Sequence, residues 1–206
     1  MKTDYEKLRD EQILKLGKNK RLLLHACCAP CSTACLERVV DDFNTTVYFY
    51  NPNMDTAEEY LKRAEEERRF IKEAYGCSVG FIEEDYRSEE YYITVKGEEC
   101  APEGGSRCAK CFNLRLSQTA KYAKEHSFDC ISTTLTVSPY KNAPLLNEIG
   151  EKVAKDYGVE WIYCDFKKKN GFLRSTELSE KYGLYRQNYC GCIFSKNRLN
   201  RAEVKE

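Results

Sequence analysis

The chain has 206 residues, of which 42% are hydrophobic, and its 33 Lys and Arg residues balance 33 Asp and Glu residues. It contains no run of about 18 apolar residues and no apolar signal segment after Met1, which argues against membrane and secreted proteins. We therefore expect a soluble, cytoplasmic protein that folds as a single domain over residues 1–206.

Short β-rich runs alternate with helical patterns. In chain order we predict a strand over 21–26, a helix over 31–42, a strand over 45–50, a helix over 56–75, a strand over 78–86, a helix over 107–126, a strand over 130–136, a helix over 141–157 and a strand over 159–165. Parallel strands need crossover connections, so this alternation predicts an α/β fold with a parallel sheet and helices on both faces. The ligand site of such a sheet lies beyond the carboxyl ends of its strands.

Seven of the 12 cysteines fall into three groups. These are Cys27, Cys28 and Cys31; Cys108 and Cys111; and Cys190 and Cys192. Thiolates are soft ligands for zinc, copper(I) and iron–sulfur clusters, and one such centre uses at most four of them. Three groups offer more ligands than one centre needs. The scattered Cys35, Cys77, Cys130 and Cys164 are expected to fill the core.

Other interpretations of the cysteines remain open. A disulfide framework is typical of small secreted chains, which this composition does not favour. Cys108 and Cys111 with Cys190 and Cys192 fit a zinc knuckle in an RNA-binding module. Cys28 and Cys31 have the spacing of a thiol-disulfide oxidoreductase.

The charge is distributed unevenly along the chain. Residues 1–100 carry 15 Lys or Arg and 21 Asp or Glu, a net charge of −6, whereas residues 101–206 carry 18 and 12, a net charge of +6. The basic half is where a polyanion is expected to bind. Cations interleaved with aromatic residues fill the C-terminal segment 166–206, and the candidate RNA contacts there are Lys167, Lys168, Lys169, Arg174 and Arg186. A lysine-rich surface without a ligand is the alternative.

Five motifs together resemble the epoxyqueuosine reductases of the QueH type. They are HACCAPCS at 25–32, FYNPN at 49–53, RCAKCFNLRL at 107–116, LTVSPYKN at 135–142 and YRQNYCGCIFS at 185–195. The resemblance covers residues 20–200, with the motifs in matching order. It implies an iron–sulfur oxidoreductase of queuosine biosynthesis that reduces epoxyqueuosine to queuosine at the wobble position of tRNAs with GUN anticodons. An electron donor, which the resemblance does not identify, would be a further partner.

The positions of the cysteines suggest how they divide. Cys108 and Cys111 share one helix face and Cys190 approaches from the tail, so we expect these three to hold a [4Fe-4S] cluster with one of the adjacent pair Cys27 and Cys28, here taken as Cys28. The other member, Cys27, would then hold an additional iron ion with Cys192, so Cys27, Cys28 and Cys192 are candidate catalytic residues. Tyr140 and Lys141 are further candidates that would donate protons or bind phosphate, and the alternative is that they are turn residues after Ser138 and Pro139. The role of Cys31 stays open.

A more distant likeness joins the chain to the PP-loop enzymes, which have the adenine nucleotide alpha hydrolase-like (HUP) fold. The glycine-rich phosphate loop of those enzymes would fall at residues 26–32, where this chain has no glycine. Backbone N–H groups need glycine to approach a pyrophosphate closely. An ATP-dependent tRNA-modifying enzyme is therefore an alternative function rather than the expected one. The Cys-containing tail is expected to fold over the site.

Overall fold

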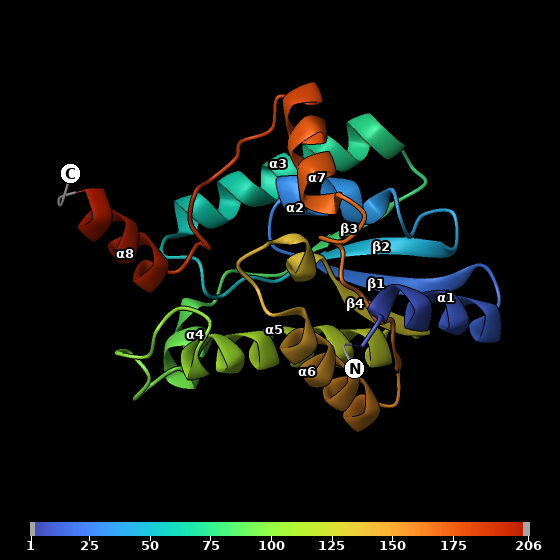
Figure 1. Cartoon of the computed structure of the whole chain (residues 1–206), viewed down its shortest axis with the longest axis horizontal. Helices are drawn as coiled ribbons and strands as arrows, with labels where there is room; N and C mark the ends of the chain where they lie inside the picture. Colours follow the sequence, from blue (N-terminus) through green and yellow to red (C-terminus); the bar gives the residue numbers. More distant parts are fainter. Residues whose placement is uncertain (1–2, 204–206) are drawn as a thin grey trace.

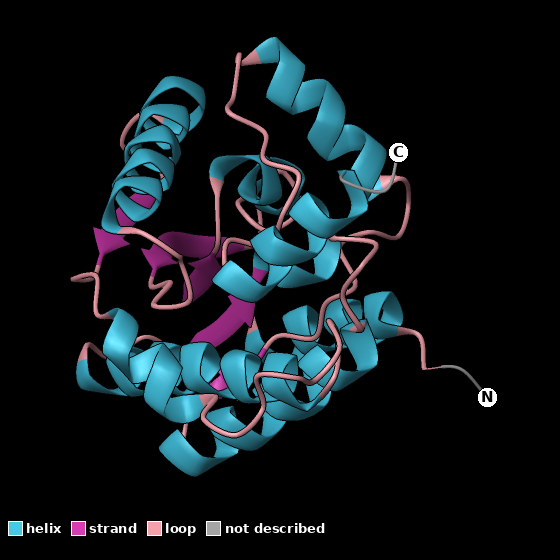
Figure 2. Ribbon diagram, turned by 90° about the vertical axis from the view of Figure 1, so that its left-hand side faces the viewer, coloured by secondary structure: helices cyan, strands magenta, loops and turns pink. Residues whose placement is uncertain are grey.

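The computed structural model describes residues 3–203 and has five parallel strands in the order β3-β2-β1-β4-β5. The strands are β1 (Lys20–Ala26), β2 (Phe43–Phe49), β3 (Gly80–Glu83), β4 (Cys130–Thr133) and β5 (Glu160–Trp161). Helices cover both faces (Figures 1 and 2). The predicted α/β class is thus confirmed, while the HUP likeness stays a prediction.

The helices form one layer on each side of the sheet. On one side lie α2 (Ala29–Leu36), α3 (Ala57–Tyr75) and α7 (Gly171–Lys181), and on the other lie α5 (Ser106–Glu125) and α6 (Ala143–Tyr157) (Figure 1). Three more helices lie outside these layers, namely α1 (Tyr5–Leu16), α4 (Ser88–Thr94) and α8 (Ile193–Glu203). No described helix is long and apolar enough to cross a membrane.

The central strand β1 is buried on both faces. Leu22, Leu23 and Leu24 are fully buried in the main core. A strand covered by helices on both faces needs such a continuous apolar run, and this is why the run at 21–26 was recognisable from the sequence. The carboxyl ends of β1, β2 and β4 lie side by side and form one edge of the sheet, called the rim below. Ala26 pairs there with Phe49 of β2, and His25 pairs with Thr133 of β4.

The order of the strands reverses beside β1. The chain leaves β1 through α2 towards β2 on one side, whereas β4 lies on the other side of β1. In open parallel sheets such a switch point opens a crevice at the carboxyl ends of the strands. The segments that follow β1 and β4 therefore face each other across this crevice.

Some predicted elements differ from the structure. The helix predicted at 31–42 is α2 and begins earlier, because Pro30 suits a first turn, where no backbone N–H is required. Residues Thr134–Val137 form a 3-10 helix rather than the end of a strand, with the Thr133 hydroxyl accepting a hydrogen bond from Leu135 N. The last strand is only Glu160–Trp161.

The helices α1, α4, α7 and α8 were not predicted. In α1 the buried residues are charged, Glu6 and Arg9, so the helix shows no apolar stripe. Glu6 instead pairs with Arg38 near the end of α2 and with Lys169. The tail runs from α7 across α3 to α8, and its residues around 186–198 cover the rim, as expected (Figure 1).

Candidate active site

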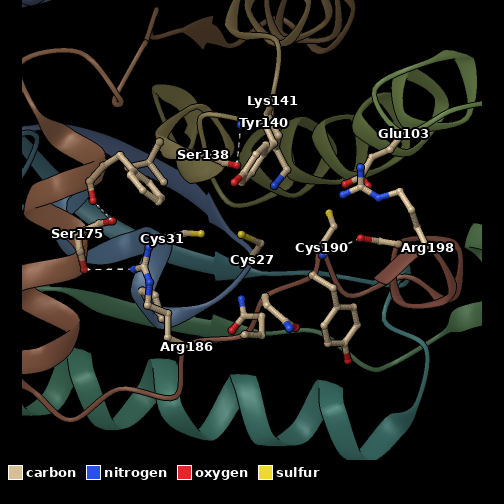
Figure 3. Close-up of a pocket in the computed structure, with 17 residues that line it drawn as sticks. Cys27, Cys31, Glu103, Ser138, Tyr140, Lys141, Ser175, Arg186, Cys190 and Arg198 are labelled. Atoms are coloured by element: carbon tan, nitrogen blue, oxygen red, sulfur yellow. Dashed lines mark hydrogen bonds and ion pairs between the residues drawn. The ribbon is translucent and has the colours of Figure 1, made fainter. Parts of the chain in front are cut away.

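A cavity of about 520 Å³ opens at the switch point of the sheet. Its walls come from the segment after β1, the segment after β4 and the tail. Figure 3 shows the sulfur atoms of Cys31, Cys27 and Cys190 in a row inside it, with the amine of Lys141 above them. Three predicted motifs, far apart in the chain, thus meet at one cavity.

The first group of thiols lies between β1 and α2. The Sγ atoms of Cys27, Cys28 and Cys31 are all within 4.8 Å of one another, so they are close enough to bind one metal ion. Hydrogen bonds from Cys28 and Cys31 hold the pKa of Cys27 well below its usual value. The same hydrogen bond with Cys27 raises the pKa of Cys28 to about 12, so the group concentrates negative charge at Cys27.

The second group lines a smaller cavity of about 70 Å³ next to the first. Cys108 and Cys111 reach it from the first turns of α5, and Cys190 and Cys192 reach it from the tail. Gly104 N donates a hydrogen bond of 3.2 Å to Cys108 Sγ. Burial raises the pKa of Cys111 to about 12. Without a bound cation, this thiol stays protonated.

Cys190 lines both cavities, so the two groups of thiols adjoin. The turn that carries Cys190 and Cys192 depends on Gly191, whose φ of +115° is rarely adopted by other residues. A Cβ there would lie 2.6 Å from the Met54 sulfur. The Gly191 carbonyl accepts a hydrogen bond of 2.9 Å from Asp55 N, which ties the turn to the segment after β2.

Two cations lie among these thiols. Lys141, on the loop before α6, lines both cavities. Burial alone would lower the pKa of its ammonium group, but the Cys190 and Cys27 thiolates raise it overall. The second cation, Arg115, is 1% exposed and lies one helical turn after Cys111 on α5. Lys141 is therefore held as a cation beside the thiols.

Residues at the carboxyl ends of β1 and β2 hold the Arg115 side chain in place. Its Nε donates to His25 Nε2 at 3.3 Å, and its Nη2 donates to Asn51 Oδ1. Burial and the charge of Arg115 lower the pKa of His25 to about 3, so this imidazole is neutral. The other contacts of the ring are with Thr133 Oγ1, 2.9 Å from Nδ1, and with the Tyr50 carbonyl oxygen, 3.3 Å from Nε2.

The other predicted residues have mixed surroundings. Tyr140 is 84% exposed at the mouth of both cavities. Lys167 pairs with Asp165 at 2.8 Å, Lys169 pairs with Glu6, and Arg174 pairs with Glu37 at 2.8 Å and with Glu177 at 3.1 Å. Arg186 lines the larger cavity and lies over the Phe172 ring. Lys168 is exposed.

Sequence reasoning missed two buried charged residues near the thiols. Arg115 stood in one of the quoted motifs without a role, and its spacing of four residues from Cys111 was the available signal. Glu67, on α3, is fully buried, and burial raises the pKa of its carboxyl group to about 8, partly opposed by the Ser32 hydroxyl. The signal that could have found Glu67 is its spacing of three residues from both Ala64 and Phe70, which places it on the buried face of α3, whereas Glu65 is exposed.

Comparison with known proteins identifies the family. A model of the family described as "Epoxyqueuosine reductase QueH" matches residues 22–198. The chain belongs to the QueH family. Curated relatives with that name include one from Streptococcus pyogenes, 45% identical over 177 residues (84% of this chain and 69% of the relative), and one from Staphylococcus aureus, 40% identical over 203 residues (92% and 85%). A third, from Thermotoga maritima, is 36% identical over 188 residues (89% and 95%).

The QueH match confirms the family expected from the motifs. It covers all seven clustered cysteines, Tyr140, Lys141 and Arg115. The match also agrees with the geometry, since the cysteines, which are scattered over most of the chain, converge on one rim. The chain is thus a member of a reductase family with a thiol-rich candidate active site.

Proposed function

We propose that this QueH family member reduces epoxyqueuosine to queuosine at the wobble position of tRNAs with GUN anticodons in the cytoplasm. The observation that carries the proposal is the convergence of the clustered thiols on two adjoining cavities. Cys27, Cys31 and Cys190 line the cavity of about 520 Å³, with Cys28 beside Cys27, and Cys108, Cys111 and Cys192 line the smaller one with Cys190. A cavity of the larger size holds a small-molecule or nucleoside ligand. The reaction removes the epoxide oxygen as water and leaves an alkene, so it consumes two electrons and two protons, with an external electron donor as the source of the electrons.

The site must pass two electrons from the external donor to the substrate, and a metal centre held by the clustered thiols would carry them. The donor set fits a [4Fe-4S] cluster and an additional iron ion, because soft thiolates outnumber the ligands of one centre. Arg115 supports this fit, since its Nη1 is buried without a hydrogen-bond partner among the described residues and faces thiols. When bound, such a centre would supply single electrons and a Lewis acid for the epoxide oxygen.

For the cluster we propose Cys28, Cys108, Cys111 and Cys190 as ligands. Arg63 supports the inclusion of Cys28, because it connects Cys28 with Cys190. A thiolate at Cys28 raises the pKa of the Arg63 guanidinium, which also donates to the Cys190 carbonyl at 3.5 Å. The additional iron would then bind Cys27, on the wall of the larger cavity, with Cys192 and with Cys31 beside Cys27.

One observation favours a second division of the thiols. Cys192 packs with Cys111 and Tyr91 and lines the smaller cavity with Cys108, Cys111 and Cys190. In that division these four residues would hold the cluster, and Cys27, Cys28 and Cys31 would hold the additional iron. The two divisions predict opposite results for a substitution at Cys192.

The chain's own groups would position the substrate and protonate it. The Lys141 ammonium lies between the two groups of thiols, where it would hold negative charge that develops on oxygen or donate a proton. Tyr140 would contact the nucleotide at the mouth. On the RNA side we propose Lys167, Lys168, Lys169, Arg174 and Arg186 as contacts to phosphates, with Arg186 nearest the cavity.

Metal analysis and a tRNA assay test this proposal. Protein purified without air should contain iron and acid-labile sulfide, and with a chemical reductant it should convert epoxyqueuosine in tRNA to queuosine. Cys108→Ser should lose the cluster and the activity, whereas Cys77→Ser, at an exposed position, should retain both. Zinc without iron or sulfide would overturn the redox mechanism and favour the zinc-stabilised RNA-binding module.

A further inference from the structure

Arg115 is a buried cation with no acidic partner. Its side chain is among the largest that are fully buried in the described chain. No ion pair joins it to a carboxylate within residues 3–203, and its described hydrogen bonds go to the neutral His25 and Asn51. Burying a charge without a counter-charge is strongly destabilising, so an arrangement of this kind needs an anion nearby.

The groups that face Arg115 are the clustered thiols. The Cys111 thiol is within hydrogen-bonding reach of its guanidinium, and Cys27 and Cys190 lie close enough to act on it when they are thiolates, so all three cysteine groups are represented around it. Its Nη1 is the nitrogen that lacks a hydrogen-bond partner among the described atoms. Cys111 and Arg115 are four residues apart on α5 and therefore lie on one helix face.

The buried Arg63 and the half-buried Arg38 have carboxylate partners, whereas the buried Arg107 has backbone carbonyls and an aromatic ring as partners. Arg63 pairs with Glu59 at 2.6 Å, and Arg38 pairs with Glu6. Arg107 donates to the backbone carbonyls of Glu98 and Glu99 and lies over the Phe194 ring. Arg115 differs from these three arginines because clustered thiols from all three cysteine groups lie near its guanidinium.

We propose that Arg115 is the internal counter-charge of the metal–thiolate centre, held in position by His25 and Asn51. This inference rests on the proposed function in that the thiols must bind metal as thiolates. Four thiolates carry more negative charge than an iron–sulfur core carries positive charge, so the assembled cluster is an anion, and reduction adds a further negative charge. A fixed cation beside it favours both assembly and the reduced state. Arg115 is thus a positioning residue that acts through the centre and not on the substrate.

The first test compares stability with and without metal. Thermal unfolding of the full chain is measured with the cluster bound and after anaerobic chelation, for the wild type, R115Q, R115K and the control R38Q. In R115Q the metal-bound form should melt at a lower temperature than the wild type, whereas the metal-free form should melt at the same or a higher temperature, because an uncompensated charge is gone. R115K should retain the wild-type difference. An equal loss in both forms of R115Q would mean a merely structural role and would overturn the proposal.

The second test measures the midpoint potential of the cluster by redox titration under electron paramagnetic resonance. R115Q should lower the potential and R115K should leave it near the wild-type value, while R38Q should not change it. This test remains decisive if the metal-free protein does not fold. An unchanged potential in R115Q with the cluster intact would refute the counter-charge role. A wild-type protein that holds no iron would instead refute the proposed function.

Discussion

The cysteine-lined rim and the basic surface of residues 167–174, called the tail surface below, are both clusters of chemically similar side chains in the sequence, yet their surroundings differ. At the rim Cys27, Cys28 and Arg115 are buried, and Arg115 lies near thiols without an acidic partner among the described residues. On the tail surface Lys167, Lys169 and Arg174 already pair with carboxylates. A buried group that lacks a partner indicates a ligand, whereas paired surface cations are stable without one.

The largest expected effect comes from Cys192, the thiol on which the two proposed divisions disagree. With Cys192→Ser we expect a four-iron spectrum to remain and turnover to fall by about 1,000-fold, because a Lewis-acidic ion contributes several kcal/mol. Iron and sulfide analysis, electron paramagnetic resonance and the tRNA assay measure these quantities. Loss of the cluster would instead assign Cys192 to it, with Cys108, Cys111 and Cys190.

Lys141 tests whether the buried cations act in the reaction. Lys141→Met should lower turnover by about 100-fold, as expected for the loss of a positioned proton donor, while the iron content stays unchanged. Lys141→Arg keeps the positive charge and should recover part of the activity. Lys152→Met, on the exposed face of α6, serves as the matched control and should behave like the wild type. Full activity in Lys141→Met would remove this residue from the mechanism.

The buried carboxyl group of Glu67 allows a test at the rim through the pH dependence of protein stability. Its folded pKa is raised from 4.5 to about 8, so its contribution to stability is fully present below the lower value and is lost as pH rises through the upper one. Between these values the unfolding free energy of the wild type should fall, relative to that of Glu67→Gln, by up to about 1.4 kcal/mol per pH unit. Urea unfolding below and above this range measures the difference. Glu73→Gln, which is exposed, should show no such trend.

The smallest effect is expected on the tail surface. Lys168 is exposed and makes no ion pair among the described residues, so it is free to bind a phosphate. Lys168→Glu should weaken tRNA binding several-fold and reduce the slope of log K against log salt concentration by about 1. Lys152→Glu on α6 is the matched control. If the slope stays the same in Lys168→Glu, the RNA contacts lie elsewhere.

The same contrast explains what could be predicted from the sequence. The buried strand at 21–26 and the helix over 56–75 have strong periodicity and clear end signals, such as the Thr56 cap and Gly76, and both were recovered almost to the residue. The helices α1 and α4 were missed because tertiary contacts stabilise them: α1 buries Glu6 against Arg38, and α4 is short. Cysteine spacing showed the three groups of thiols along the chain. It did not show which groups lie next to one another in space, because that depends on the turn at Gly191.

The tail that lines the cavity has a consequence for synthesis. Cys27 is synthesised before β2, and Cys190 and Cys192 are synthesised after β5, so all five strands can be made before the thiol set is complete. Metal loading by the full set would therefore follow synthesis of the sheet. Once bound, the centre would link the segment after β1 to the turn before α8 and close the residues between Cys27 and Cys190 into one loop. Such a long-range link lowers the entropy of the unfolded chain, so metal loss should lower the stability of the fold.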